Sequence, residues 1–583
     1  MIETGDKVTR KYKNFRGVDF RGEECSLNRS PDCLNVWRNY KKLASIETRP
    51  GLEHFYTYPN GVRSMMWHEN KLYFTSSDGY VHALNSDGTL QYEINYVGLP
   101  SLLFKFNGNL YAKGEANYID VTSGTPITPY IPTTRISGKV VLDSDTASSG
   151  GVKHEDVNML SDYRINTFLA SDDEVGYVLW LDTQNIDSDF VPVVTINDKP
   201  VTNFQVDYKK GKILLAAVPP ASTTVGRDNI SVKFKKHVDG YSESILKCTI
   251  ATEFDNRVFF SGNPDYPSTV WHSSLHDPTY CSDLDYYVDG VDESPVRSMV
   301  AGNNGLWVFK DESEANSSVY YHTPTIDSEY GKVYPSSHSS ISLGCVGRAT
   351  NFNDDIVFFS QRGMEGASTD ITTEQFVTHR SSLVDRKLTV HPKYKDMILA
   401  EWEGYLLVFM GGDVYLADSR AVLTNENHIE YEWFYWNLGS HNVTCAVSHD
   451  GVLYIGTSEG HIYSFTREAK DGDAHYNNKS QEQMHIESYW TTPKDNFGAP
   501  NKLKTTNKKG CVTEALGDVA VSVKTDGDDA YELIGKKEGI DDYFVSRIKR
   551  KKWKDIQLKF ESKTGFSLEA ASLECFIGGY IKR

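Results

Sequence analysis

The stretch MMWHENKLYFTSSDGYVHALNSDG, residues 65–88, decides the fold because its pattern recurs along the chain. It places aromatic and β-branched residues on both sides of a short Ser-Asp-Gly turn, which is typical of a β-hairpin. Six later stretches repeat the same apolar strand after a polar turn. Aligned on that strand, the seven copies carry an aliphatic residue at Leu72, Leu110, Val258, Leu306, Ile356, Leu406 and Leu453. The Ser76–Gly79 turn is therefore interpreted as a hairpin connection and not as a binding site.

The spacing of the copies indicates the architecture. The intervals between them are 38, 148, 48, 50, 50 and 47 residues, and five of these lie near the roughly 40–50 residues of a propeller blade. A single four-stranded sheet cannot bury both of its faces, whereas sheets stacked around an axis can. We therefore predict an all-β chain built on a β-propeller of about seven blades. Six or eight blades are the alternatives, because both chain ends often contribute to one terminal blade.

The long interval predicts an inserted domain, since exposed loops tolerate insertions. Five strand candidates in it suggest a small β-sandwich: 175–183, 190–196, 203–208, 212–218 and 230–237. After Phe465 the polar residues 466–483 are predicted to form a linker or long loop. Residues 484–583 are predicted to form a second β-sandwich or a sheet docked on the propeller, because WKDIQLKFES alternates at period two.

These patterns divide the chain into five predicted regions. They are an N-terminal arm and the strand that leads into the propeller (1–60), the first blades (61–129), the inserted β-sandwich-like domain (130–245), the remaining blades (246–470), and the linker with the C-terminal β domain (471–583).

Composition excludes several classes of protein. The net charge is −18, which argues against a sequence-independent nucleic-acid binder, because such proteins need a basic surface. Eight cysteines are spread over 583 residues without a CxxC pair, so we expect free thiols in a reducing compartment. The first residues contain no apolar signal-peptide core, and no apolar run reaches the length of a membrane span. We therefore expect neither secretion nor a membrane span.

The sequence contains no recognised catalytic motif, and its 17 histidines show no metal-ligand spacing. An acidic cluster could hold a hard cation, but it lacks EF-hand spacing and is interpreted as a solvated loop; its members are Asp283, Asp285, Asp289, Asp292 and Glu293. Residues 524–532 are interpreted as an Asp-Gly turn, and NSDGTLQY (85–92) resembles a sialidase Asp-box that occurs once. We predict a non-enzyme with no catalytic, cofactor-binding or metal-binding residues and no cofactor.

The segment NFRGVDFRGEECSLNRSPDCLNVWRNYKKLASIETRPG, residues 14–51, is the most specific text in the chain. It resembles the start of tail nozzle and tail-stabilisation proteins of tailed bacteriophages, the tail tubular and head–tail stabilisation β-propeller proteins. The matching pieces are Asn14-Phe15-Arg16-Gly17, Ser30-Pro31-Asp32 with Asn35 and Trp37, and Thr48-Arg49-Pro50-Gly51. The family's doubled glycine is absent at Arg16-Gly17, and the signature does not predict the insertion at 130–245. The same residues also fit a strand that closes the propeller.

The resemblance implies a structural virion protein of the phage tail, assembled in the host cytoplasm. It implies a homohexameric ring below the portal and adaptor that contacts other tail proteins and lines the channel for DNA ejection. Viral DNA would pass through this lumen without specific binding, which an acidic lining favours by repelling phosphate. The inserted and C-terminal β domains are the candidate ring contacts.

Two other function classes stay open at this point. One is a tail-associated protein that binds or cleaves glycans on the host surface, which predicts a solvent-facing groove of Trp and carboxylates. The other is a cellular scaffold propeller without a viral role, which the neighbouring genes would reveal.

Overall fold

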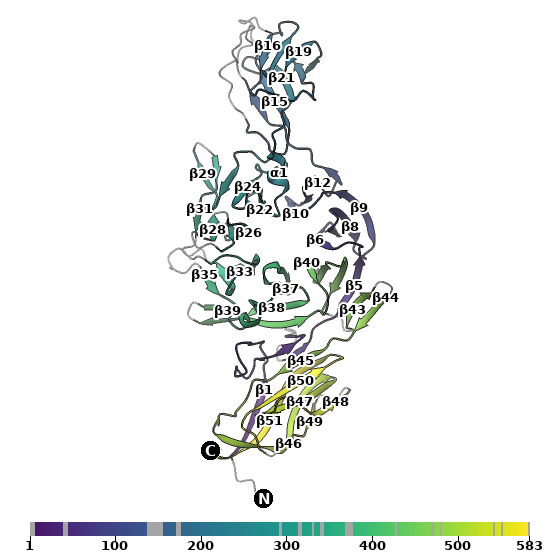
Figure 1. The fold of residues 1–583 in the computed structure, drawn as a ribbon, viewed down its shortest axis with the longest axis vertical. Helices are drawn as coiled ribbons and strands as arrows, with labels where there is room; N and C mark the ends of the chain where they lie inside the picture. The colour runs from purple at the N-terminus through teal and green to yellow at the C-terminus, as the bar shows by residue number, and fades with distance from the viewer. Residues whose placement is uncertain are drawn as a thin grey trace. The chain divides into compact units, whose positions relative to one another are not determined.

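In the computed structural model the chain forms two compact units, residues 1–94 with 297–583 and residues 95–296 (Figure 1). Each unit is described by itself. The described residues are 6–38, 45–136, 155–170, 177–290, 294–312, 317–328, 331–338, 343–367, 377–425, 428–467, 472–477, 480–526, 528–539, 543–549 and 552–580.

The predicted all-β class is confirmed, and the described residues include seven four-stranded sheets. Five of them belong to the first unit, apart from residues 95, 96 and 296. They consist of β6 (Val62–His68), β7 (Lys71–Ser76), β8 (Tyr80–Asn85) and β9 (Leu90–Tyr96); β26 (Val296–Gly302), β27 (Gly305–Lys310), β28 (Val319–His322) and β31 (Ser336–His338); β32 (Ala349–Phe352), β33 (Asp355–Ser360), β34 (Gly363–Ala367) and β35 (Val377–His379); β36 (Ile398–Trp402), β37 (Tyr405–Met410), β38 (Asp413–Asn425) and β39 (His428–Asn437); and β40 (Val443–His449), β41 (Val452–Thr457), β42 (His461–Phe465) and β5 (Leu52–Thr57).

The other two sheets belong to the second unit. They consist of β10 (Leu102–Phe106), β11 (Asn109–Lys113), β12 (Tyr118–Asp120) and β13 (Thr125–Pro126), and of β22 (Ile250–Phe254), β23 (Arg257–Ser261), β24 (Thr269–His272) and β25 (Tyr286–Val288).

The repeat read from the sequence is the second strand of each sheet. All seven aligned aliphatic residues, from Leu72 to Leu453, are at most 2% exposed. The turn before each of these strands has two successive residues with positive φ, which defines a type I′ hairpin and explains the choice of Asn, Asp and Gly; these pairs are Glu69-Asn70, Asn107-Gly108, Asp255-Asn256, Asn303-Asn304, Asn353-Asp354, Glu403-Gly404 and Asp450-Gly451.

Neighbouring sheets of the first unit share apolar cores. Trp67 and Leu72 of one sheet pack with Ile462 of another, and Phe309 and Phe358 join a second pair of sheets. The strand β5 completes the sheet of β40, β41 and β42, because it pairs antiparallel with β42. The first part of the chain therefore supplies the fourth strand of the last repeat, but this strand follows the signature at 14–51, whose own strands Cys33–Leu34, Val36–Arg38 and Ile46–Thr48 belong to other sheets.

The second unit also contains two further sheets with a core of their own. One has the order β14–β15–β21–β17–β18 and the other the order β16–β20–β19. All five predicted strands of this region are present. The strands are β14 (Thr133–Arg135), β15 (Tyr163–Phe168), β16 (Val178–Trp180), β17 (Val193–Ile196), β18 (Lys199–Val201), β19 (Phe204–Asp207), β20 (Lys212–Leu215) and β21 (Ile230–Lys235), and helix α1 (Tyr241–Leu246) follows them.

The two chain ends combine in two larger sheets of the first unit, which we call the terminal body. One sheet has the order β2–β45–β50–β47–β48, and the other has the order β3–β4–β51–β46–β49 with β1 paired to β51. The strands are β1 (Asp6–Lys13), β2 (Cys33–Leu34), β3 (Val36–Arg38), β4 (Ile46–Thr48), β45 (Ser488–Thr491), β46 (Lys502–Gly517), β47 (Val519–Thr525), β48 (Glu532–Lys537), β49 (Tyr543–Ser546), β50 (Ile556–Ser562) and β51 (Phe566–Tyr580).

Two regions differ from the sequence prediction. Within the predicted arm, β1, β2, β3 and β4 are strands of the terminal body, and their apolar residues Tyr12, Cys33, Val36, Trp37 and Ile46 belong to a buried core. The predicted linker at 466–483 contains the hairpin of β43 (Asp473–Asn477) and β44 (Ser480–Met484), since polar side chains also suit a two-stranded sheet. The remaining short elements of the first unit are β29 (Thr325–Asp327), β30 (Gly331–Val333), α2 (Asp385–Leu388) and the 3₁₀ turn Tyr394–Asp396. Among the described residues, no helix has the length and apolar character needed to cross a membrane.

Candidate functional site

The described residues of the signature segment, 14–38 and 45–51, contribute to a junction between the sheet of β36–β39 and the terminal body. Asn35, Trp37 and Arg49 are at most 5% exposed. Gly51 lies so close to the backbone of Gly472 that an added Cβ would be 2.0 Å from its carbonyl oxygen. These three signature residues therefore lie inside the protein, whereas Asn14, Arg16 and Asp32 of the same signature are exposed.

Arg49 is the centre of this junction. Its Nη1 donates to Asp473 Oδ1 at 2.8 Å and to the Pro50 carbonyl oxygen at 3.0 Å. Its Nη2 bonds Asp473 Oδ2 and donates to the Asn437 carbonyl oxygen at 3.1 Å. The Nε–H donates to Asn35 Oδ1 at 2.9 Å. All three guanidinium nitrogens are used, so Arg49 fixes the hairpin of β43 and the end of β39 against the signature segment.

Asn35 adopts a positive φ of 54°, which asparagine tolerates better than most residues. Its Oδ1 also accepts the backbone N–H of Asn437 at 2.8 Å, and its Nδ2 donates to the Glu487 carbonyl oxygen at 2.8 Å. Asn35 lies between β2 and β3, and its amide joins β39 to the segment before β45.

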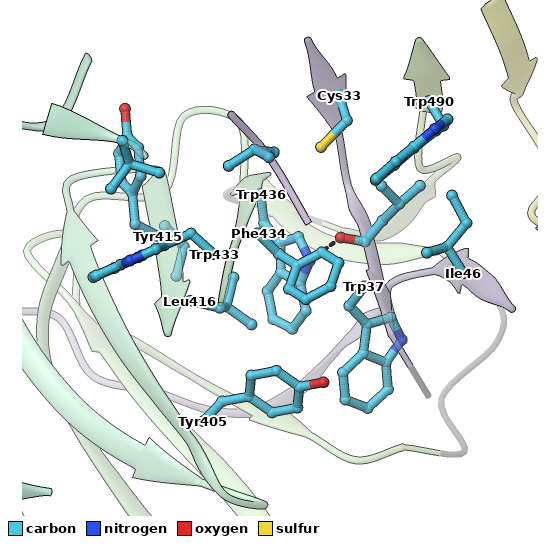
Figure 2. Close-up of a cluster of buried hydrophobic side chains, with 14 of the residues drawn as sticks. Cys33, Trp37, Ile46, Tyr405, Tyr415, Leu416, Trp433, Phe434, Trp436 and Trp490 are labelled. Carbon is cyan, nitrogen blue, oxygen red and sulfur yellow. Dashed lines mark hydrogen bonds between the residues drawn. The ribbon is translucent and has the colours of Figure 1, made fainter. Parts of the chain in front are cut away.

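An aromatic cluster fills the space beside these polar contacts, as Figure 2 shows. The Trp37 ring stacks on Trp402 at a centroid distance of 5.5 Å and meets Trp436 edge-on at 6.0 Å. Tyr405 lies 5.6 Å from Trp37, and its hydroxyl donates to the Arg38 carbonyl oxygen. The Trp436 Nε1–H donates to the Val36 carbonyl oxygen at 3.1 Å. Such aromatic pairs add to the stabilisation from burial, so β3 is anchored firmly against β36, β37 and β39.

The opening residues of the signature extend the same junction. Phe15 is fully buried and meets the Trp490 ring edge-on at 5.4 Å. A Cβ on Gly17 would lie 2.4 Å from the Trp433 carbonyl oxygen, so only glycine allows this close approach. Arg29 forms a buried ion pair with Glu432 at 2.6 Å. Burial raises the pKa of Glu432, which Arg29 partly opposes.

A second polar cluster, which the sequence analysis missed, surrounds His379 at the end of β35. Its Nε2 lies 2.5 Å from Asp385 Oδ2 and its Nδ1 lies 3.1 Å from Glu365 Oε1. Burial lowers the pKa of His379, but the hydrogen bonds to both carboxylates outweigh it and raise the pKa to about 9. No sequence signal could have found this cluster, because its members carry no recognised motif.

The His379 cluster resembles a Ser-His-Asp arrangement in composition but not in geometry. Ser381 Oγ is fully buried and donates to Asp385 instead of to the histidine. A histidine with a pKa of about 9 is protonated at neutral pH and cannot accept a proton as a general base. The cluster is therefore suited to hold β34, β35 and α2 together.

The raised pKa of His379 predicts a pH-dependent stability. Because the folded pKa exceeds the unfolded value of about 6.5, the stabilisation is fully present below pH 6.5 and is lost as the pH rises through 9. We expect the free energy of unfolding to fall by up to about 3 kcal/mol between these limits. The measurement is urea unfolding at pH 6, 7.5 and 9.5 for the unmodified chain and for His379→Gln, whose profile should be flatter.

His272→Gln is the matched control for this experiment. Burial lowers the pKa of His272 to about 4, so this residue is neutral throughout the alkaline range and its removal should leave the alkaline slope unchanged. Equal slopes for the unmodified chain and His379→Gln would contradict the assignment.

The acidic clusters are held by local contacts. Asp283 accepts from the Tyr241 hydroxyl at 3.0 Å, and burial raises the pKa of Asp285 to about 6. Asp292 and Glu293 lie outside the described residues. In the 524–532 segment, Asp528 accepts from the Thr525 backbone N–H at 2.8 Å, and Gly527 of the predicted Asp-Gly turn lies outside the described residues. Within the described part of the chain, no three His, Cys, Asp or Glu side chains gather as a metal site would require.

Three further predictions concern the Ser76–Gly79 turn, the cysteines and the segment at residues 85–92. The Ser76–Gly79 segment is a hairpin turn between β7 and β8, in which Ser76 Oγ bonds Asp78, so its interpretation as a connection is confirmed. All eight cysteines are free thiols, and seven of them are buried. In the 85–92 segment, Asp87 accepts from the Thr89 backbone and hydroxyl at 2.9 and 2.6 Å, which forms an ordinary turn.

No family model and no curated protein matches this chain. Among solved structures, the computationally designed Ika8 protein is similar, with 10% identity, 71% of this chain and 99% of that chain covered, and a TM-score of 0.33. BamB from Moraxella catarrhalis shows 9% identity, coverage of 78% and 97%, and a TM-score of 0.31. Glutaminyl cyclase of Myxococcus xanthus shows 9% identity, coverage of 37% and 89%, and a TM-score of 0.22. At these TM-scores the similarities assign neither the fold nor a function.

Proposed function

We propose that this protein is a structural component of a phage tail nozzle, in which its seven four-stranded sheets close into one seven-bladed propeller and its copies form a ring around the DNA ejection channel. The observation that carries this proposal is that the two chain ends taken together and the middle of the chain have net charges of opposite sign. Residues 1–60 and 484–583, which include the terminal body, contain 29 Lys and Arg against 23 Asp and Glu. Residues 61–483 contain 32 Lys and Arg against 56 Asp and Glu.

This charge division suits a head-to-tail ring. A ring of identical copies needs two different patches on each chain, and opposite charges orient such patches toward each other. Residues 1–60 with 484–583 have a net charge of +6, and residues 61–483 have −24. Exposed basic residues on the body include Lys11, Lys13, Arg547 and Lys549. An acidic remainder also suits a channel through which DNA moves without adhering.

An exposed apolar strand supports a contact at the same body. β49 is the last strand of its sheet, and its Tyr543 and Val545 are 67% and 51% exposed. Leu533 on β48 is 59% exposed. The exposed Arg547 and Lys549 follow this strand, and an exposed apolar edge strand is the type of surface that a neighbouring subunit covers.

The glycan alternative loses its main structural support. It predicts a solvent-facing groove of Trp and carboxylates, but all ten tryptophans are at most 5% exposed. Their aromatic rings serve as core residues, which leaves no tryptophan platform on the propeller sheets.

The test is the assembly state of the purified full-length chain. We expect light scattering and negative-stain images to show closed rings of six copies at low salt, with fewer rings in 1 M NaCl. The double variant Tyr543→Asp with Val545→Asp should remain folded and monomeric. The control Val225→Asp changes a fully exposed valine in the second unit and should still form rings. Single chains at every concentration and salt would refute the ring.

A further inference from the structure

A pocket of about 400 Å³ opens in the second unit among the strands β14, β15 and β16. Ile136, Val157 and Leu181 provide apolar wall, while Arg164, Trp180 and Asp182 provide polar groups. The volume lies in the range of small-ligand sites, and such sites combine apolar walls with a few fixed polar groups. Its residues belong to one compact unit, and none of them is part of the terminal body.

Buried hydrogen-bond donors without acceptors mark this pocket. Arg164 Nε and Trp180 Nε1 are both buried, and neither has a hydrogen-bond partner. Trp180 is only 4% exposed, so its indole N–H gains little from bulk water. The Asn166 Nδ2 on the same strand as Arg164 is also unpaired. An unpaired buried donor is destabilising, and a ligand with suitably placed acceptors would satisfy it.

The guanidinium of Arg164 determines the charge of the ligand. No carboxylate of the described residues forms an ion pair with Arg164, although Glu155 also lines the pocket. The Glu155 carboxylate is held against β14 instead of against Arg164, because its two oxygens accept from the Tyr130 hydroxyl and the Thr133 backbone N–H, each at 2.7 Å. Arginine is suited to bind a planar carboxylate through two parallel hydrogen bonds. The exposed carboxylate of Asp182 disfavours a more highly charged group such as phosphate.

We propose that this pocket binds an acidic sugar, whose single carboxylate pairs with Arg164 and whose ring lies against the apolar wall formed by Ile136, Val157 and Leu181. The ring hydroxyls provide acceptors for the Trp180 N–H. This site does not rest on the nozzle assignment, because it needs only the second unit's own residues.

The test is calorimetric titration of the full-length protein with D-glucuronate, with D-glucose, acetate and glucose 6-phosphate as comparison ligands. We expect saturable binding of glucuronate in the millimolar range or tighter, and at least tenfold weaker binding of glucose and of acetate. Tighter binding of glucose 6-phosphate than of glucuronate would overturn the carboxylate assignment. Absence of saturable glucuronate binding would overturn the site.

Two variants and one control locate the binding. Arg164→Met should weaken glucuronate binding at least tenfold. Trp180→Phe keeps an aromatic ring in the core but removes the N–H, and should weaken binding severalfold. Arg135→Met is the matched control, because Arg135 on β14 pairs with Asp228 at 3.1 Å instead of lining the pocket. Equal affinities for all three folded variants would place the ligand elsewhere and refute the proposal.

Discussion

Replacing Arg49 by methionine is expected to lower the free energy of unfolding by about 3–5 kcal/mol, because it removes one partner of a buried ion pair. The substitution leaves the Asp473 carboxylate, the Asn35 amide oxygen and the Asn437 carbonyl without their shared donor. Methionine is similar in length to arginine, so the decrease in the free energy of unfolding reflects the lost hydrogen bonds and charge more than the lost side-chain volume. The measurement is urea unfolding followed by tryptophan fluorescence.

Arg297→Met is the matched control for Arg49→Met. Arg297 pairs with Asp311 at 3.0 Å in the same unit, but its side chain is 42% exposed. Exposed pairs contribute about 0–1 kcal/mol, so this variant should be nearly as stable as the unmodified protein. Arg49→Lys keeps the charge but not the planar fork and should recover only part of the loss. Similar effects of Arg49→Met and Arg297→Met would show that the junction does not stabilise the fold.

Replacing Trp37 by alanine is expected to cost about 3–5 kcal/mol, the usual range for removing a buried large aromatic side chain. The cavity would lie between Trp402, Trp436 and Tyr405, all of which contact the indole. These residues belong to three different strands, and the cavity would therefore loosen β3 from β36, β37 and β39. Thermal and urea unfolding of the full-length variant measure the loss.

Two comparisons separate packing from other effects of Trp37→Ala. Trp37→Phe keeps an aromatic ring and should cost clearly less than alanine. Tyr543→Ala removes an aromatic residue that is 67% exposed, and should change the stability by less than about 0.5 kcal/mol. A Trp37→Ala protein as stable as Tyr543→Ala would contradict the role of the cluster.

The features that sequence reasoning predicted are local ones. The seven repeated strands begin after turns whose Asn, Asp and Gly residues adopt positive φ, and both the turns and the alternation of apolar residues are visible in short windows. For the same reason, all five strands proposed within 130–245 have counterparts in the structure. The alternation in WKDIQLKFES likewise marks β50.

The features that sequence reasoning missed depend on contacts between distant segments. Arg49 and Asp473 are 424 positions apart, and nothing near either residue indicates the other. The polar composition of Asp473–Asn477 suggested a loop, but Asp473 is fixed by Arg49 and its strand pairs with β44. The signature at 14–51 was correctly singled out as specific text. Its burial could not be deduced, because a single sequence does not distinguish residues that fix a fold from residues that meet a partner.

The pairing of β1 with β51 has a consequence for how the protein is made. The ribosome releases the N-terminal strands first, yet their partner Phe566–Tyr580 is synthesised about 560 residues later. At roughly 5–20 residues per second, the early strands wait about 30–110 s for that partner. During this interval Phe15 and Trp37 lack the late-synthesised or distant residues that cover them. Nascent chains are therefore expected to need chaperone protection at their first 50 residues until synthesis is complete.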